Sequence, residues 1–149
     1  MIAIAPPPIK EQWRQIRFTS TLYLGPILDV LLAQIPERWK AEIRLGLQEA
    51  LVNAAKHVNR LDPCKTIEVR YAVINGYYWW IISDQGSGFC NPCNQNYQAE
   101  DYLPDDDSEN GRGVCLLHQI FDLVYWNDQG RELRLCKQVN NYLRQPLIC

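Results

Sequence analysis

Four polar residues recur on one side of a helical stretch in the first half of the 149-residue chain. They are Glu49, Asn53, Lys56 and His57, at i, i+4, i+7 and i+8, which places them on one helix face. The amide oxygen of Asn53 suits Mg²⁺, a hard cation that completes its shell with waters and phosphates. Glu49 could accept a proton from an attacking hydroxyl, and Lys56 could meet phosphate as a point charge. The alternative interpretation is a solvated helix face.

A second group of candidate residues follows an apolar strand. Asp84 ends that strand, and Gly86, Gly88 and Phe89 come soon after it. A carboxylate held there can accept a hydrogen bond from an exocyclic amine such as that of adenine. Glycines let a ligand approach the backbone closely and permit positive φ. Asp and Gly also favour plain turns, so an ordinary strand-to-loop turn is the structural alternative.

The third group consists of Gly111, Arg112 and Gly113, immediately before a short predicted helix. Backbone N–H groups and the helix dipole at such a position both favour a bound phosphate. A single Gly-x-Gly before a helix is weak evidence by itself. All three groups together, in this order, predict a site for ATP and Mg²⁺.

The apolar pattern predicts the elements that must position these groups. Strands are expected at 17–24, 66–74, 77–83, 123–127 and 132–139, and helices at 27–35, 37–58 and 114–121. Asn75-Gly76 between two β-rich runs predicts a tight hairpin. Early helices followed by strands in hairpins indicate an α+β fold: a mostly antiparallel mixed sheet of about five strands, covered on one face by about three helices.

Composition places the chain among ordinary globular domains. Hydrophobic residues make up 47% and charged residues 21%, and the net charge of −2 gives no reason to expect nucleic acid or a membrane as a partner. No apolar run approaches the roughly 20 residues that span a bilayer. We expect an extended, proline-containing lead-in over 1–16 and a single domain over 17–149.

The six cysteines are expected to be free thiols of a cytoplasmic protein, because no signal peptide is recognisable at the N-terminus. Cys90 and Cys93 form a Cys-x-x-Cys pair, which is half of a zinc site. Two ordinary loop thiols are the favoured interpretation, and a thiol-responsive regulator is the alternative. His57 and His118 are expected to have structural roles.

These motifs resemble the ATP-binding domain shared by histidine kinases, Hsp90, gyrase B and MutL, which has the two-layer Bergerat-type fold. Within that superfamily the chain looks most like the stand-alone anti-sigma factor serine/threonine kinases, over roughly residues 17–139. The resemblance implies that Glu49 is the general base and Asn53 the Mg²⁺ ligand. It further implies that Asp84 with its glycines binds adenine.

The same resemblance assigns the remaining segments. Gly111 and Gly113 would close over the phosphates, and residues at about 90–110 would form a mobile ATP lid. Glu109 stands where some members place an arginine near the γ-phosphate, and Arg112 is the expected substitute.

The implied function is phosphorylation of a small STAS-type antagonist protein, which frees the kinase to hold a sigma factor or another regulator. The alternative is a non-catalytic module that uses ATP to sequester a partner. Homodimers are common in the resembled family. The run Tyr77-Tyr-Trp-Trp80 is expected to expose two rings on the uncovered sheet face, which favours such an interface.

Overall fold

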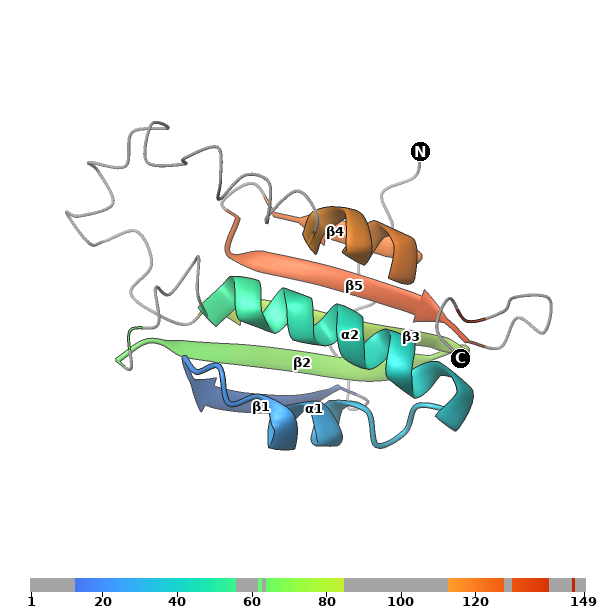
Figure 1. The fold of residues 1–149 in the computed structure, drawn as a ribbon, viewed down its shortest axis with the longest axis horizontal. Coiled ribbons are helices and arrows are strands. Elements are labelled where there is room, and N and C mark those ends of the chain that lie inside the picture. The colour runs from blue at the N-terminus through green and yellow to red at the C-terminus, as the bar shows by residue number, and fades with distance from the viewer. Residues whose placement is uncertain are drawn as a thin grey trace.

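The computed structural model describes residues 13–55, 64–84, 113–127 and 130–139, together with Asp62 and Pro146. The elements follow one another as β1 (Arg14–Thr19), α1 (Gly25–Leu31), α2 (Glu37–Asn53), β2 (Thr66–Ile74), β3 (Tyr77–Asp84), β4 (Leu123–Trp126) and β5 (Glu132–Gln138) (Figure 1). A further helix over residues 113–120 precedes β4.

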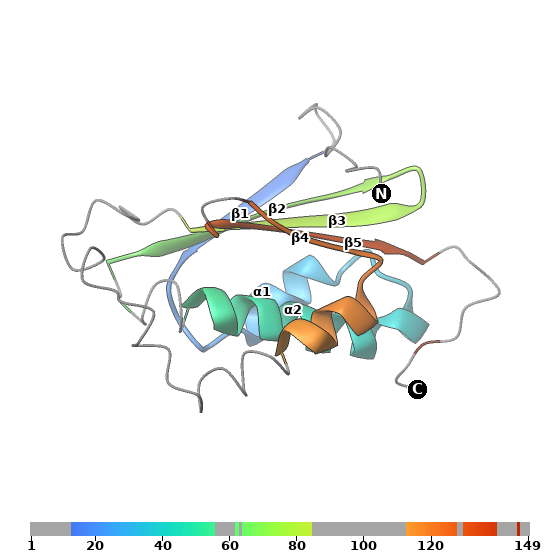
Figure 2. The ribbon, with the colours of Figure 1, turned by 90° about the horizontal axis from the view of Figure 1, so that it is seen from above.

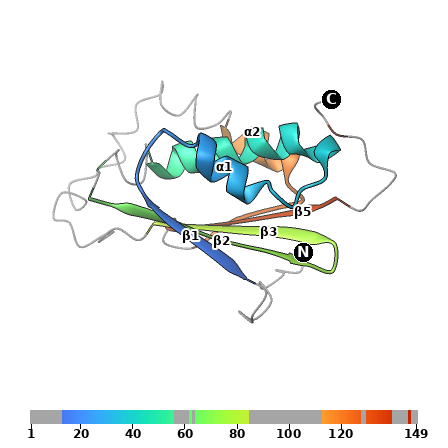
Figure 3. The ribbon, with the colours of Figure 1, turned by 90° about the horizontal axis from the view of Figure 1, so that it is seen from below.

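The strands form one five-stranded sheet in the order β1-β2-β3-β5-β4, so β3 lies at its centre. All four strand pairings are antiparallel, so the sheet is not mixed. The three helices lie together against one face of the sheet, as the two side views show (Figures 2 and 3). The predicted two-layer α+β sandwich is therefore confirmed.

The central hairpin forms where the sequence predicts it. β2 pairs with β3 from Ile74 opposite Tyr77 to Ile67 opposite Asp84. Both turn residues have positive φ, 53° at Asn75 and 81° at Gly76, which matches the tight turn that Asn-Gly favours. This hairpin fixes Asp84 at the end of the central strand.

The first two elements begin earlier than predicted. β1 pairs with β2 over Arg14–Thr19 instead of residues 17–24, so the sheet begins within the expected lead-in of 1–16. After β1, Leu24 is buried in the core immediately before α1, and Pro26 lies in the first turn of that helix. Proline is well tolerated there because a first-turn N–H lacks a helical partner anyway. Core burial and this helix start override the β-favouring composition of residues 20–24.

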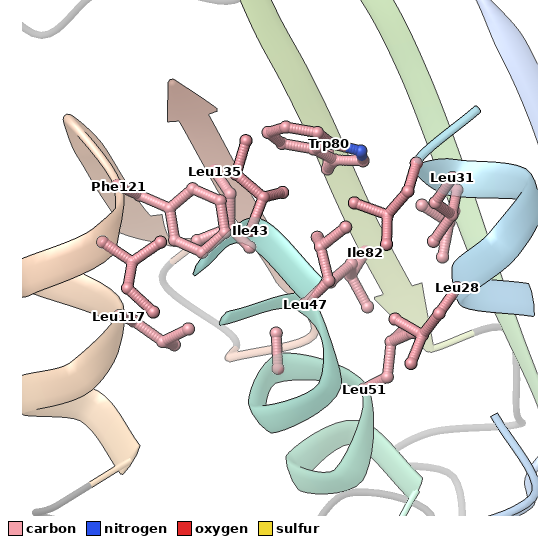
Figure 4. Close-up of a cluster of buried hydrophobic side chains, with 14 of the residues drawn as sticks. Leu28, Leu31, Ile43, Leu47, Leu51, Trp80, Ile82, Leu117, Phe121 and Leu135 are labelled. Carbon is pink, nitrogen blue, oxygen red and sulfur yellow. The ribbon is translucent and has the colours of Figure 1, made fainter. Parts of the chain in front are cut away.

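The core lies between the helices and the inner face of the sheet. From α2, Ile43, Leu47 and Leu51 are fully buried, and they face Trp80 and Ile82 of β3 (Figure 4). Each such leucine or isoleucine contributes about 1.5–3 kcal/mol relative to an exposed position. This packing holds α2 in place across the central strand.

An ion-pair network crosses the outer face of the sheet. Glu68 of β2 pairs with Arg17 of β1 at 2.8 Å, and Arg70 pairs with Glu132 of β5 at the same distance. Glu132 also pairs with Arg134 at 2.9 Å. Arg70 and Arg134 stand directly opposite Ile81 on its two sides, and Ile81 is only 2% exposed.

The expectation that two rings of 77–80 are exposed is wrong. Tyr77 is 39% exposed, but Trp79, on the outer face, is only 5% exposed. Its cross-strand neighbours are Ala72 and Cys136, two small side chains beside which a large ring can pack closely. These rings therefore no longer argue for a dimer.

Cys136 lies in this buried part of the outer face, and burial together with the charge of Asp122 raises the pKa of its thiol from 9.0 to about 12. The native protein should therefore be alkylated at the exposed Cys64 and Cys115 at pH 8 but not at Cys136, which should react only in denaturant. On unfolding, the pKa of the Cys136 thiol returns to its lower value. The free energy of unfolding should therefore fall as pH rises above 9. Peptide mass mapping checks the alkylation, and equal labelling of all three thiols would contradict it.

Candidate functional site

One face of α2 lies against the helix formed by residues 113–120. That helix presents its buried residues Gly113, Leu117 and Ile120, which recur at the spacing of a single face. On α2 the facing residues are Glu42, Gly46, Glu49 and Asn53, which we call the α2 seam. Figure 2 shows the two helices side by side beneath the sheet.

Gly46 allows the two helices to approach closely in the middle of the seam. A Cβ atom at this position would lie 2.6 Å from Cε2 of Phe121 and 3.2 Å from Cγ2 of Ile120. The first distance is far below van der Waals contact. Only glycine therefore fits here without movement of the Phe121 ring or of the helix over 113–120.

The end of the α2 seam that carries Glu49 and Asn53 lies against the start of the 113–120 helix. A Cβ atom at Gly113 would lie 3.2 Å from Oε2 of Glu49 and 3.6 Å from Nδ2 of Asn53. The structure thus brings together three predicted site residues that come from two distant parts of the chain. Glu49 and Asn53 are half-buried. We call the place where Gly113 meets this carboxylate and this amide the cradle.

The two helices run in opposite directions. The first residue, Gly113, lies beside Glu49 and Asn53, whereas Ile120 and Phe121 lie beside Gly46, nearer the start of α2. The first N–H groups of the helix, which have no acceptor within the helix itself, and the positive end of the helix dipole are therefore at the cradle. An anion placed between the helix start and Asn53 would meet both.

The last residue of β3, Asp84, pairs with Ile67 at the sheet end nearer the close of α2. Beside it, a shallow, mainly apolar hollow opens between α2 and the sheet. It is lined by Ala50, Ala54, Ile82, Trp126, Arg131 and Leu133, together with Gly130. Arg131 supplies the charge in this otherwise uncharged lining.

Several predicted residues lie outside the part of the chain that the structure describes. They are Lys56, His57, Gly86, Gly88, Phe89, Cys90, Cys93, Gly111, Arg112 and the lid at about 90–110. His118 is described and is exposed on the 113–120 helix, so it has no packing role in the core.

Sequence reasoning missed a buried ion pair. Lys137 of β5 and Glu42 of α2 are 4% and 1% exposed, and Nζ of Lys137 lies 3.2 Å from Oε1 of Glu42. The signal was present in β5, where the inward alternation Leu133, Leu135 is continued by Lys137. A cation at an inward strand position requires a buried anion, and an acidic residue on α2 supplies it.

Replacing Gly113 by alanine should weaken nucleotide binding while it leaves the stability of the fold nearly unchanged. The added Cβ meets the flexible end of Glu49, which can move by a few tenths of an ångström, so the unfolding midpoint should stay near the wild-type value. The added methyl group would crowd the phosphates between Asn53 and the start of the 113–120 helix, so Mg²⁺·ATP affinity should fall about tenfold or more. Titration calorimetry checks this, and unchanged affinity in Gly113→Ala would place the ligand elsewhere.

The fold and the cradle together define an α+β sandwich domain with a polar site beside a helix start, next to an apolar hollow. The chain belongs to the histidine kinase-like ATPase domain family, whose family model matches residues 27–137. The prediction of the family is therefore confirmed.

A curated relative adds a finer likeness. The chain is 28% identical over 104 residues to the serine-protein kinase RsbW of Bacillus licheniformis. That match covers 66% of this chain and 64% of the relative, so the chain spans just under two thirds of the relative's length. Among the described residues, no helix is long and apolar enough to cross a membrane.

Proposed function

We propose that this protein is an ATP-dependent serine/threonine kinase of the anti-sigma regulatory type. The observation that carries the proposal is the cradle, in which a carboxylate and an amide on α2 face the first residue of another helix. The similarity to a serine-protein kinase supports the same assignment. The family membership makes ATP the expected nucleotide.

The residues of the cradle fit Mg²⁺ and a triphosphate. An amide oxygen is a hard ligand of the kind that Mg²⁺ takes, and the amide group of Asn53 lies next to the first residue of the 113–120 helix, with Nδ2 3.6 Å from where a Cβ atom of residue 113 would lie. Asn53 would hold Mg²⁺ through its amide oxygen, and the ion would supply positive charge to the phosphates. Backbone N–H groups at the start of the 113–120 helix donate to the phosphates, with Gly111, Arg112 and Lys56 as further contacts.

Glu49 acts as the general base. It takes the proton from a serine hydroxyl while the serine oxygen attacks the γ-phosphorus. The bond between this phosphorus and the β–γ bridging oxygen breaks, which gives phosphoserine and ADP and leaves the proton on Glu49. Phosphoryl transfer depends mainly on positioning and charge neutralisation. Those are the two tasks that this arrangement performs.

The hollow beside the end of β3 takes the adenine ring. Asp84 accepts a hydrogen bond from the exocyclic amine of adenine, and Gly86, Gly88 and Phe89 allow the backbone to approach the ring. Ala50 and Ala54, small residues at the end of α2, line this hollow together with Ile82. Adenine thus lies at one end of the α2 seam, and the phosphates extend toward Gly113.

The partner is a small STAS-type antagonist protein with a phosphorylatable serine, and its phosphorylation frees the kinase to hold a sigma factor or another regulator. The test is to co-express the chain with candidate antagonists and to measure phosphoserine on them by mass spectrometry. Phosphoserine that requires Glu49 supports a kinase. Stable, ATP-dependent complexes without any phosphoserine would refute the kinase and leave a non-catalytic switch module.

A further inference from the structure

Lys137 lies at the centre of a buried cluster at the far end of the α2 seam. Its ammonium group lies 3.2 Å from Oε1 of Glu42, donates a hydrogen bond to the carbonyl oxygen of Ile120, and lies 4.7 Å from the ring centre of Trp39. The cluster therefore joins β5, α2 and the last residue of the 113–120 helix.

Core stability alone does not account for this cluster. Moving an ammonium and a carboxylate out of water costs several kcal/mol each, and a well-packed apolar pair of equal volume is often at least as stabilising. An ion pair instead makes the packing of the elements that it joins more specific, because its donors and acceptors are satisfied in only one arrangement of these elements. An apolar contact would tolerate a sliding helix, whereas a hydrogen bond to one carbonyl does not.

The contact with Ile120 holds the 113–120 helix at its end. Carbonyl groups in the last turn of a helix have no partner within that helix, and a cation there also meets the negative end of the helix dipole. Next to it, the N–H of Phe121 donates to the carbonyl of Leu117 at 2.8 Å, which closes the helix. Lys137 thus sets the position of this helix end relative to α2.

The opposite end of the same helix forms the cradle. Glu42 and Glu49 lie two turns apart on α2, and the short helix spans the distance between them in the reverse direction. Because the helix is rigid, the contact that holds Ile120 also fixes the position of Gly113 at the other end of the helix. At Gly113 the clearance is small, since a Cβ atom would lie only 3.2 Å from Oε2 of Glu49.

We propose that Lys137 is a positioning residue for the nucleotide site. By tying the end of the 113–120 helix to Glu42, it sets where Gly113 stands relative to Glu49 and Asn53. This inference rests on the proposed function for the identity of the ligand, but its structural part can be measured without any ligand.

The test uses the double variant Glu42→Gln with Lys137→Met, which removes both charges and keeps side-chain length. The matched control is Arg70→Met with Glu132→Gln, which removes an ion pair of 2.8 Å from the outer face of the same sheet. Two quantities are measured: hydrogen exchange of the amides of 117–121, which are hydrogen-bonded within the helix, without nucleotide, and affinity for Mg²⁺·ATP.

In the double variant the amides of 117–121 should exchange faster, and Mg²⁺·ATP affinity should fall about tenfold to 100-fold. The control should match the wild type in both. A folded double variant with wild-type exchange and affinity would overturn the proposal. If wild-type protein bound no Mg²⁺·ATP, the proposed function would fail, and the exchange data would still decide the role of Lys137.

Should the double variant not fold, Lys137→Arg replaces it. Arginine keeps the charge, but its longer, planar guanidinium group cannot reproduce the contact geometry at Ile120. The proposal then requires faster exchange at 117–121 and weaker Mg²⁺·ATP binding in a folded protein. Wild-type values in Lys137→Arg would contradict it.

Discussion

The variant Glu49→Gln should lose phosphoryl transfer by about 100-fold to 10,000-fold, which is the range a general base contributes. Glutamine keeps the size and shape of the side chain at the cradle but cannot accept the serine proton. Mg²⁺·ATP affinity should stay within about threefold of wild type, because Asn53 and the start of the 113–120 helix are untouched. The measurement is the rate of phosphoserine formation on the antagonist protein at saturating ATP.

The matched control for this variant is Gln48→Glu, a change of the same chemistry one residue earlier on α2, at an exposed position. It should transfer phosphate at the wild-type rate. Normal transfer by Glu49→Gln would remove Glu49 from the mechanism. Loss of ATP binding in Glu49→Gln would show instead that the carboxylate supports the site structurally.

The variant Gly46→Ala should destabilise the fold more than any other single methyl group added to a described glycine. Its Cβ would lie 2.6 Å from the ring of Phe121, which is buried and packs edge-on against Trp80 with ring centres 5.7 Å apart. Alanine gains up to about 1 kcal/mol in helix propensity over glycine. Overpacking a rigid ring costs about 1–3 kcal/mol, so the net result should be a loss of stability.

Thermal and urea unfolding measure this effect, and each kcal/mol lost should lower the unfolding midpoint by roughly 4 °C. Gly25→Ala is the control, because a Cβ atom there meets nothing within 4 Å. Its midpoint should equal that of the wild type or exceed it slightly. A Gly46→Ala protein as stable as the control would mean that the two helices do not pack as closely as described.

The predictable parts of this fold are those with a local signal. Asn75-Gly76 has a turn preference strong enough to fix both β2 and β3, and the apolar stripe of α2 specifies its buried face. The start of β1 was not predictable in this way, because Arg14 and Gln15 are exposed residues of an edge strand. Their place is set by pairing with Tyr71 and Arg70, far along the chain.

For the candidate site, sequence alone indicated that Glu49 and Asn53 share a helix face. That Gly113 lies against them depends on the packing of two helices, which no local pattern encodes. The role of Gly46 was not predicted, because from sequence a glycine within a helix indicates only a low helix propensity. The requirement for glycine at this position is steric, and it becomes evident only from the contact with Phe121.

Thermal unfolding of the wild-type protein with and without Mg²⁺·ATP, beside Asn53→Ala, tests the central claim most directly. ATP at about 100 times its dissociation constant should stabilise the folded protein by about 2.7 kcal/mol, which is easily seen as a higher midpoint. We expect this rise in the wild type and its loss in Asn53→Ala or when Mg²⁺ is chelated. An unchanged wild-type midpoint, or an equal rise in Asn53→Ala, would contradict a nucleotide site at the α2 seam.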